Sequence, residues 1–368
     1  MSRPAISIQK SGGWTFGSPS VLMMFYRAPG ELQSELQEMD ECMPHYYKIT
    51  NGHGQGAETI MRAEADFMRA CFADAQIMLE RAYAQIDGNG QENMALCCDF
   101  LAWRLSLCTS FTPRESFEQR REALLGLHNV AWLNILQSSC AYYYALLGLP
   151  EKIPAVFREH QLASIHFLAP GKPMMELIEN QVYLAQGEYA KVIGHSEALL
   201  GMCEAMHYAL VALHIRLQTA AAYEMLGKRE TADELLISAL AAAEPDALYL
   251  PFVENYRYLK TALTRGAGAK FAAFVRTVTP LGEDFVRRCG EKRAEGSRPA
   301  ALAGLTERES AIAALVAKRL SNREIAEQLF LSEGSVKQYI NQIYSKLLIT
   351  GDVRTKRKRL AELAAPKS

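Results

Sequence analysis

The residues best suited to recognition chemistry lie near the C-terminus, in a helix predicted over residues 333–347. At about 100° per residue, one face of this helix is apolar, whereas the opposite face combines amides, a lysine and a glycine. Amides pair with the edges of DNA bases, lysine pairs with guanine or phosphate, and glycine allows close backbone approach. The pattern predicts a DNA-reading helix, although polar faces of this kind are usually just solvated surface. The apolar residues are Val336, Ile340, Ile343 and Leu347, and the polar ones are Gly334, Lys337, Gln338, Asn341, Gln342 and Ser345.

Three more short helices are expected around this one. Capping boxes at 306–309 (TERE) and 321–324 (SNRE) each precede an apolar run, and Ser332 can cap the helix over 333–347. A fourth helix is expected within 355–363. The second helix, a tight turn and the third helix together form a helix-turn-helix.

The same segments closely resemble the LuxR/GerE-type DNA-binding domain in order and spacing, over about 60 residues. The resemblance rests on LTERE at 305–309, LSNREIA at 320–326, LSEGSVK at 331–337 and IYSKL at 343–347. It implies a four-helix domain whose third helix enters the major groove of double-stranded DNA, often as a homodimer joined through the fourth helix. It implies base contacts for Lys337, Gln338 and Asn341. It implies positions near phosphates for Thr306, Ser321, Ser332, Ser335 and Lys346.

Two features near the end of this domain qualify the resemblance. Leu348 stands where the family usually has a glycine, and a left-handed conformation there would strain a leucine by about 1 kcal/mol. The run RTKRKR over 354–359 is unusually basic, so Arg357 and Lys358 either add phosphate contacts or form a solvated face. Leu360 and Leu363, three residues apart, are the expected apolar contact of a dimer.

A search for catalytic, metal or cofactor sites favours none. Cys203, His207 and His214 can share one helical face, but a packed helix with incidental soft residues is the better interpretation. Neither a phosphate-binding G-x-x-x-x-G-K-[ST] motif nor a G-x-S-x-G nucleophile elbow occurs. The glycine-rich stretch 52–56 follows no predicted strand, so we expect a loop leading into a helix near Ala57. We therefore expect no enzyme.

From about residue 57 to 265 the hydrophobic period is helical, with a helix start expected at Thr112. A Y-x-x-x-G motif recurs with its glycines at 148, 187 and 227. It indicates stacked helix pairs that loosely resemble tetratricopeptide repeats, with an unrelated all-α bundle as the alternative. Residues 214–217, 222–227 and 243–246 also look like the repeat region of MalT-like regulators. Those regulators normally carry an ATPase before the repeats, and none is recognisable here. The chain is then a stand-alone short form or the C-terminal part of a longer design.

Composition is that of a globular protein, with 49% hydrophobic and 22% charged residues in 368. The charge is uneven: residues 301–368 carry 12 Lys and Arg against 7 Asp and Glu, whereas the whole chain has a net charge of −1. Such asymmetry indicates a small basic module on a mildly acidic body. The eight cysteines form no C-x-x-C pair, which favours a reduced cytoplasmic protein. Residues 1–20 contain no sustained apolar run, so no secretory signal is expected. The charge-free stretch 123–150 is long enough to span a bilayer, but its polar residues favour a buried helix that starts at Asn129.

These observations predict an all-α protein with four parts. They are a poorly defined segment over 1–56, a helical-repeat domain over 57–289, a linker over 290–303 and the DNA-binding domain over 304–366. We expect a cytoplasmic transcriptional regulator that binds DNA as a homodimer and receives an effector or a protein partner at the repeats. The alternative is a protein-interaction scaffold with a vestigial DNA-binding module.

Overall fold

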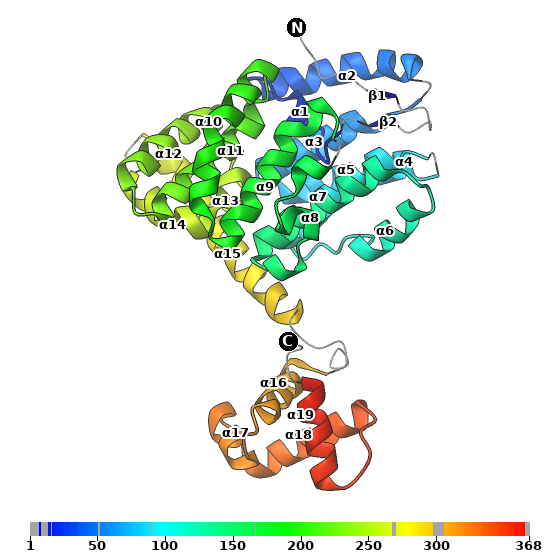
Figure 1. The fold of residues 1–368 in the computed structure, drawn as a ribbon, viewed down its shortest axis with the longest axis vertical. Coiled ribbons are helices and arrows are strands. Elements are labelled where there is room, and N and C mark those ends of the chain that lie inside the picture. The colour runs from blue at the N-terminus through cyan, green and yellow to red at the C-terminus, as the bar shows by residue number, and fades with distance from the viewer. Residues whose placement is uncertain are drawn as a thin grey trace. The chain divides into compact units, whose positions relative to one another are not determined.

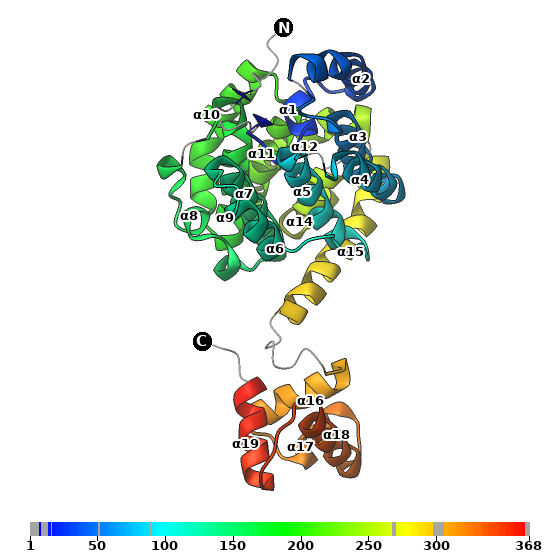
Figure 2. The same cartoon turned by 90° about the vertical axis from the view of Figure 1, so that its right-hand side faces the viewer.

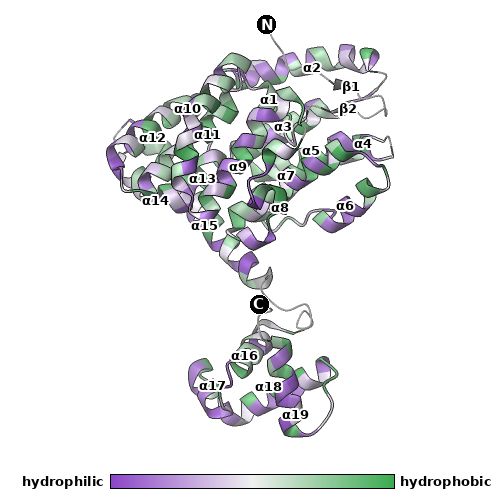
Figure 3. Ribbon diagram, viewed as in Figure 1, coloured by the Kyte–Doolittle hydropathy of each residue, from purple (hydrophilic) through white to green (hydrophobic). Residues whose placement is uncertain are grey.

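The computed structural model describes residues 7–8, 14–15, 17–50, 52–88, 90–165, 167–266, 270–296 and 305–364. The chain divides into two compact units, Met1–Cys289 and Gly290–Ser368. Each unit has an apolar core of its own. The predicted all-α class is confirmed, because the only strands among the described residues are the two-residue β1 (Ser7–Ile8) and β2 (Trp14–Thr15), which pair antiparallel. Hydrophobic and hydrophilic residues both occur along the helices of the two units, as amphipathic packing requires (Figure 3).

The first unit is built from α-helices, the last of which continues past Cys289, and they are joined by turns, irregular segments and four 3-10 segments (Figure 1). The helices are α1 (Leu22–Phe25), α2 (Leu32–Ile49), α3 (Ala57–Met68), α4 (Phe72–Ile86), α5 (Glu92–Cys108), α6 (Phe117–Leu125), α7 (Val130–Leu147), α8 (Ala155–Arg158), α9 (Lys172–Gln186), α10 (Tyr189–Met206), α11 (Ala209–Met225), α12 (Arg229–Ala243), α13 (Leu250–Glu254), α14 (Tyr256–Gly266) and α15 (Ala272–Gly296). The 3-10 segments are η1 (Pro150–Lys152), η2 (Leu162–Ser164), η3 (Ala169–Gly171) and η4 (Glu244–Asp246).

The N-terminal helices belong to this body and do not form a separate segment. The apolar run over 21–26 is buried in the main core, where α1 contacts α3 and α11 (Figure 2). The Leu22 N–H donates to Glu64 Oε2 at 2.7 Å, and the Ala209 N–H donates to the Tyr26 carbonyl at 3.0 Å. The expectation of a poorly defined segment over 1–56 is therefore wrong for 17–50. The apolar run in this segment packs into a core formed by helices that are distant in the sequence.

The glycines of the repeated motif end three helices in the same way. Gly148, Gly187 and Gly227 have φ of 71°, 78° and 74°, in the left-handed region. After each glycine, the next N–H donates to the carbonyl of the motif tyrosine, which is the Schellman arrangement. These bonds are Leu149 to Tyr144 at 3.0 Å, Glu188 to Tyr183 at 2.9 Å and Lys228 to Tyr223 at 2.9 Å. A packed partner helix follows α9 and α11, namely α10 and α12, whereas η1 and α8 follow α7. Two helix pairs thus repeat, and a tetratricopeptide-like array stays a prediction.

The charge-free stretch 123–150 holds the end of α6 and all of α7. Asn129 caps α7 as expected, because its side-chain oxygen accepts from the N–H groups of Ala131 and Trp132 at 3.1 and 3.3 Å. Ile135, Leu136 and Tyr142 on α7 are buried against other helices. In the described part of the chain, no helix combines the length and apolarity needed to cross a membrane.

The second unit consists of α16 (Glu307–Ala317), α17 (Asn322–Leu329), α18 (Glu333–Lys346) and α19 (Val353–Ala364), packed around a small core (Figure 2). Residues 290–296 of the predicted linker are helical, because α15 continues to Gly296. A charged segment without an apolar face can still prolong a helix whose earlier turns are packed. Residues 297–304 and 365–368 lie outside the described residues.

Candidate nucleic-acid interface

Three hydroxyl side chains start the first three helices of the second unit. Thr306 Oγ1 accepts from the Glu309 N–H at 3.3 Å, and Ser321 Oγ accepts from the Glu324 N–H at 3.3 Å. In both boxes the glutamate Oε2 accepts the N–H of the cap residue in return, at 2.7 Å. Because those bonds stabilise the carboxylate, the pKa of Glu324 lies below its usual value. The predicted capping boxes are present, and both hydroxyls already have partners within the unit.

The reading helix α18 begins in the same manner. Ser332 Oγ accepts from the Ser335 N–H at 3.0 Å and lies 2.8 Å from the Ser335 hydroxyl. The preceding turn passes through Phe330 at φ 53°, and the Leu331 N–H donates back to the Ala326 carbonyl at 2.9 Å. A left-handed residue is what a tight turn between two helices requires. The turn therefore fixes α18 against α17, with which it packs.

The two faces of α18 separate as the periodicity predicts. Val336, Ile340 and Ile343 are buried in the core, and Leu347 packs against its edge. Tyr344 is also buried at 8% exposure, which the predicted stripe did not include. Its position one residue after Ile343 widens the stripe, and a tyrosine there gave no clear signal of burial.

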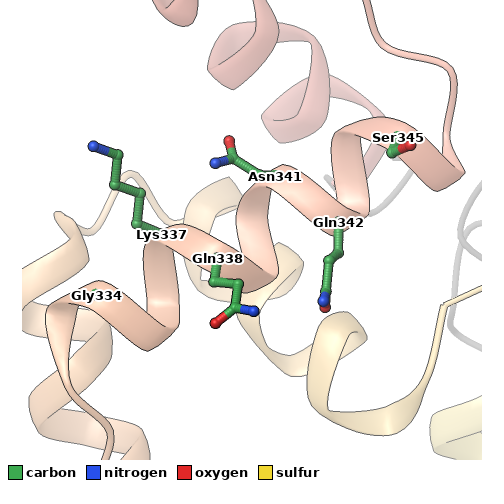
Figure 4. A pocket seen from close by; sticks show the side chains of 6 residues that line it. All are labelled: Gly334, Lys337, Gln338, Asn341, Gln342 and Ser345. Atoms are coloured by element: carbon green, nitrogen blue, oxygen red, sulfur yellow. The ribbon is translucent and has the colours of Figure 1, made fainter.

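The opposite face of α18 is an open polar hollow of about 520 Å³ (Figure 4). Lys337 and Asn341 project from one side of the helix, and Gln338 and Gln342 from the other. Among the described residues, the side chains of Lys337, Gln338 and Asn341 have no hydrogen-bond or ion-pair partner, and all three are exposed. The hollow thus presents unengaged donors and acceptors on one rigid helix. Its lining residues are Gly334, Lys337, Gln338, Asn341, Gln342 and Ser345.

The basic residues predicted near phosphates fall into two groups. Lys346 Nζ donates to Glu309 Oε2 at 2.7 Å, and the glutamate side chain is 3% exposed. Burial opposes ionisation of Glu309, but the hydrogen bonds from Lys346 and Thr306 outweigh it and hold its pKa below the usual value. Lys346 is therefore a structural partner of α16, whatever else it contacts.

The basic run of α19 divides in the same way. Arg357 donates from one terminal nitrogen to Asn322 Oδ1 at 2.8 Å and from the other to the Leu320 carbonyl at 2.6 Å. It ties α19 to the start of α17. Lys358, by contrast, is 79% exposed, and its Nζ lies 3.8 Å from Glu362 Oε1 in an exposed ion pair. Arg354 and Arg359 are exposed as well.

Two leucines near the end of the domain were singled out in the sequence. Leu348 has φ 51°, so the end of the third helix, which the sequence left open, takes the left-handed conformation. The prediction that Leu360 forms a dimer contact is wrong, because this side chain is fully buried in the core of its own unit, where α19 packs on α16. Leu363 is partly buried against the same core. Spacing of three residues identified the apolar face of α19 but not the surface that it covers.

The weaker candidate sites of the sequence all lie in the first unit. Cys203 and His214 are buried in the first unit, and His207 is an exposed residue that ends α10 with φ 56°. Over the described ranges, no three His, Cys, Asp or Glu side chains are grouped so that they could hold a metal ion. The glycine-rich stretch 52–56 leads into α3 at Ala57, as expected.

Comparison with known proteins identifies the second unit. Residues 303–357 match the family of bacterial regulatory proteins of the luxR type, described as GerE. The chain is 41% identical over 63 residues to the transcriptional regulatory protein LnrK of Bacillus subtilis (strain 168), which covers 16% of this chain and 29% of that protein. It is 39% identical over 46 residues to the DNA-binding transcriptional activator DevR/DosR of Mycobacterium tuberculosis (strain ATCC 25618 / H37Rv), covering 12% and 21%. The matches thus span less than a third of either relative. No solved structure gives a significant match. The chain carries a luxR-type helix-turn-helix domain at its C-terminal end, as the resemblance in its sequence implied.

Proposed function

We propose that this chain is a sequence-specific transcriptional regulator that reads the major groove of double-stranded DNA with α18. The observation that carries the proposal is the exposed face of α18, which presents two amides and a lysine without partners among the described residues. Gln338 and Asn341 can each exchange two hydrogen bonds with a base edge, and Lys337 can reach guanine or phosphate. The names of the two relatives, a regulator and a DNA-binding activator, agree with this function.

Phosphate contacts are proposed around this helix. Thr306, Ser321, Ser332 and Ser335 stand at helix starts, where backbone N–H groups and the helix dipole favour anions. Lys358, with Arg354 and Arg359, supplies exposed positive charge on α19. Lys346 and Arg357 are also proposed to lie near phosphates. Their contribution to DNA binding is expected to be smaller, because each already has a partner inside the unit.

We further propose that two copies bind one inverted repeat. A single four-helix module covers few base pairs, and dimeric helix-turn-helix proteins place two reading helices about one helical turn apart. With Leu360 buried, the exposed apolar residue of α19 is Val353, at 80% exposure. The contact between copies is therefore assigned to the start of α19.

The helix pairs of the first unit are proposed to receive the signal, as an effector or a protein partner. The supporting observation is that α9 and α11 have the same Schellman ends, and that the pairs α9–α10 and α11–α12 pack on one another. The likeness to MalT-like repeats stays a prediction.

The reading function is tested by selecting bound sequences from a random duplex pool with the full chain. We expect a sequence motif to be enriched. Gln338→Ala and Asn341→Ala should each cost about 1–3 kcal/mol on the enriched site and little on random duplex, with the salt dependence almost unchanged. Gln328→Ala, an exposed amide on α17 outside the hollow, is the matched control and should change neither. Equal weakening on every duplex, or no enriched motif, would exclude α18 as the reader.

A further inference from the structure

The first unit contains a cavity of about 660 Å³ beside one of the helix pairs that we propose receive the signal. It lies between α9, α10 and the irregular segment that precedes α9. Its size is that of small-molecule sites, which are mainly apolar with a few placed polar groups. The apolar lining residues include Leu162, Ile165, Phe167, Met175, Leu199 and Met202.

A buried carboxylate faces this cavity without a donor. The Glu179 side chain on α9 is 7% exposed, and among the described residues it accepts no hydrogen bond. Among the described residues, the nearest basic atom is His160 Nδ1, at 3.5 Å from Glu179 Oε1. A buried carboxylate of this kind is costly unless a cation or a proton compensates it.

His160 does not supply that compensation in its neutral form. Gln186 Nε2 donates to the Arg158 carbonyl at 3.0 Å, which leaves Gln186 Oε1 to accept from His160 Nε2 at 2.8 Å. With the proton on Nε2, the neutral ring turns the lone pair of Nδ1 towards Glu179. Burial lowers the pKa of His160, so the neutral form is favoured.

The other charged groups around Glu179 do not compensate the charge of its carboxylate either. Glu176 lines the same cavity on the same helix and repels it. Lys191 on α10 attracts it, but its Nζ lies 3.5 Å from Glu188 Oε2 and over the Tyr183 ring. His195 on α10 and Lys172 on α9 line the cavity at exposed positions. Burial first, and then Glu176, raise the pKa of Glu179 to about 7.

We propose that this cavity binds a small molecule with an apolar body and a protonated amine, whose ammonium group pairs with Glu179. The ammonium supplies the missing donors, Glu176 adds a second negative charge, and the apolar lining takes the body of the ligand. Tyr183, stacked on His160 with ring centroids 4.0 Å apart, forms a rigid aromatic wall. The use of this site as the signal input rests on the DNA-binding function proposed above, whereas the binding itself does not.

The test is calorimetric titration of the full chain, free of DNA, with phenethylamine, tyramine and tryptamine. Phenethyl alcohol and hydrocinnamate serve as the neutral and anionic counterparts of phenethylamine. At least one amine is expected to bind at millimolar concentration or below, and phenethylamine about tenfold or more tighter than its two counterparts. In the wild type, amine affinity should fall by up to about tenfold per pH unit below the Glu179 pKa of about 7.

Two variants and a control complete the experiment. Glu179→Gln keeps the side-chain shape and should abolish both the preference for amines and its pH dependence. Ala198→Trp, at an exposed position in the lining, should block binding of every probe. Glu204→Gln, exposed on α10 outside the lining, should bind as the wild type does. The proposal is overturned if no amine binds, if the alcohol or the carboxylate binds as well as phenethylamine, or if Glu179→Gln retains the preference. A failure to select a DNA motif would leave these results unaffected.

Discussion

Lys346 Nζ lies 2.7 Å from Glu309 Oε2, so one ion pair joins the last turn of the reading helix α18 to the first turn of α16. The same carboxylate oxygen accepts the Thr306 N–H at 2.7 Å, which places the capping box and the lysine on one atom. A cation held in this way contributes less to the release of counterions from DNA than a free one, because its charge is already matched. Lys346 is therefore one of the cations that hold the unit together, whereas the exposed cations of α19 are available to contact phosphate.

The first prediction compares Lys346 with Lys358. Lys346→Gln should lower the unfolding free energy of the second unit by up to about 1 kcal/mol, since the Glu309 pair is half exposed at the lysine, and should flatten the salt slope of duplex binding by less than 1 unit. Lys358→Gln should leave stability within about 0.5 kcal/mol and flatten the slope by about 1 unit. Hydrogen exchange of the α16–α19 amides in the full chain and anisotropy titrations across a salt series measure the two quantities. Equal slope changes in both variants would contradict this division.

The second prediction concerns Leu348, which is 85% exposed and has φ 51°. Its N–H donates to the Ser345 carbonyl at 3.2 Å, so the left-handed turn is part of the helix end. Leu348→Gly removes the steric strain and loses no buried contact, but glycine loses more backbone entropy on folding than leucine does. The net effect should be a rise in the unfolding free energy of this unit of about 0.5–1 kcal/mol. Leu348→Ala retains the strain and is the control. The same hydrogen-exchange measurement applies, and a gain with alanine equal to that with glycine would show that strain is not the cause.

The second unit was predictable because its signals are local. Each of the caps at Thr306, Ser321 and Ser332 bonds to a residue three positions later, and the buried face of α18 follows from periodicity alone. The roles of Lys346 and Arg357 were not predictable, because their partners lie 37 residues away in the sequence. A basic run looks the same whether its members face solvent or a carbonyl group.

Long-range contacts also explain the differences in the first unit. A helix was expected to start at Thr112, but α6 starts after Ser116, whose capping box with Gln119 is complete. Arg114, expected in the first turn, instead reaches Glu80 and Asp87 and stacks over Tyr83. The N-terminal segment was missed for a similar reason. The Tyr26 hydroxyl donates to Asp246 Oδ2 at 2.6 Å, although the two residues are 220 positions apart in the sequence. No local sequence pattern predicts such a contact.

The third prediction tests the dimer contact on α19. Val353→Asp changes an exposed residue, so the fold should persist while cooperative binding to an inverted repeat is lost. Leu360→Ala should instead destabilise the second unit by about 2–5 kcal/mol, because it empties part of a packed core. Sedimentation on the selected operator and hydrogen exchange distinguish the two effects. A complex of two chains per operator in the Val353→Asp variant would place the contact elsewhere.

The last prediction concerns His214, which is fully buried on α11 with neither ring nitrogen bonded to a described residue. Burial, with a smaller effect of Arg104, lowers its pKa well below the usual 6.5, so the ring is neutral in the folded chain. In the unfolded chain it takes up a proton below about pH 6.5. The unfolded state then binds more protons, so the contribution of His214 to stability is lost as the pH falls, by about 1.4 kcal/mol per unit.

His214→Leu removes this penalty together with two unsatisfied polar atoms. We expect the variant to be at least as stable as the wild type near pH 8, and its advantage to grow by about 1.4 kcal/mol per pH unit below about 6.5 until the folded histidine itself takes up a proton. Glu64 and Glu179, whose pKa values are raised to about 7, act in the opposite direction, but they are present in both proteins and cancel in the difference. The three tryptophans, Trp14, Trp103 and Trp132, all lie in the first unit, so denaturant unfolding followed by their fluorescence reports the relevant transition. A difference in unfolding free energy that does not change with pH would show that His214 is protonated or hydrogen-bonded in the folded chain.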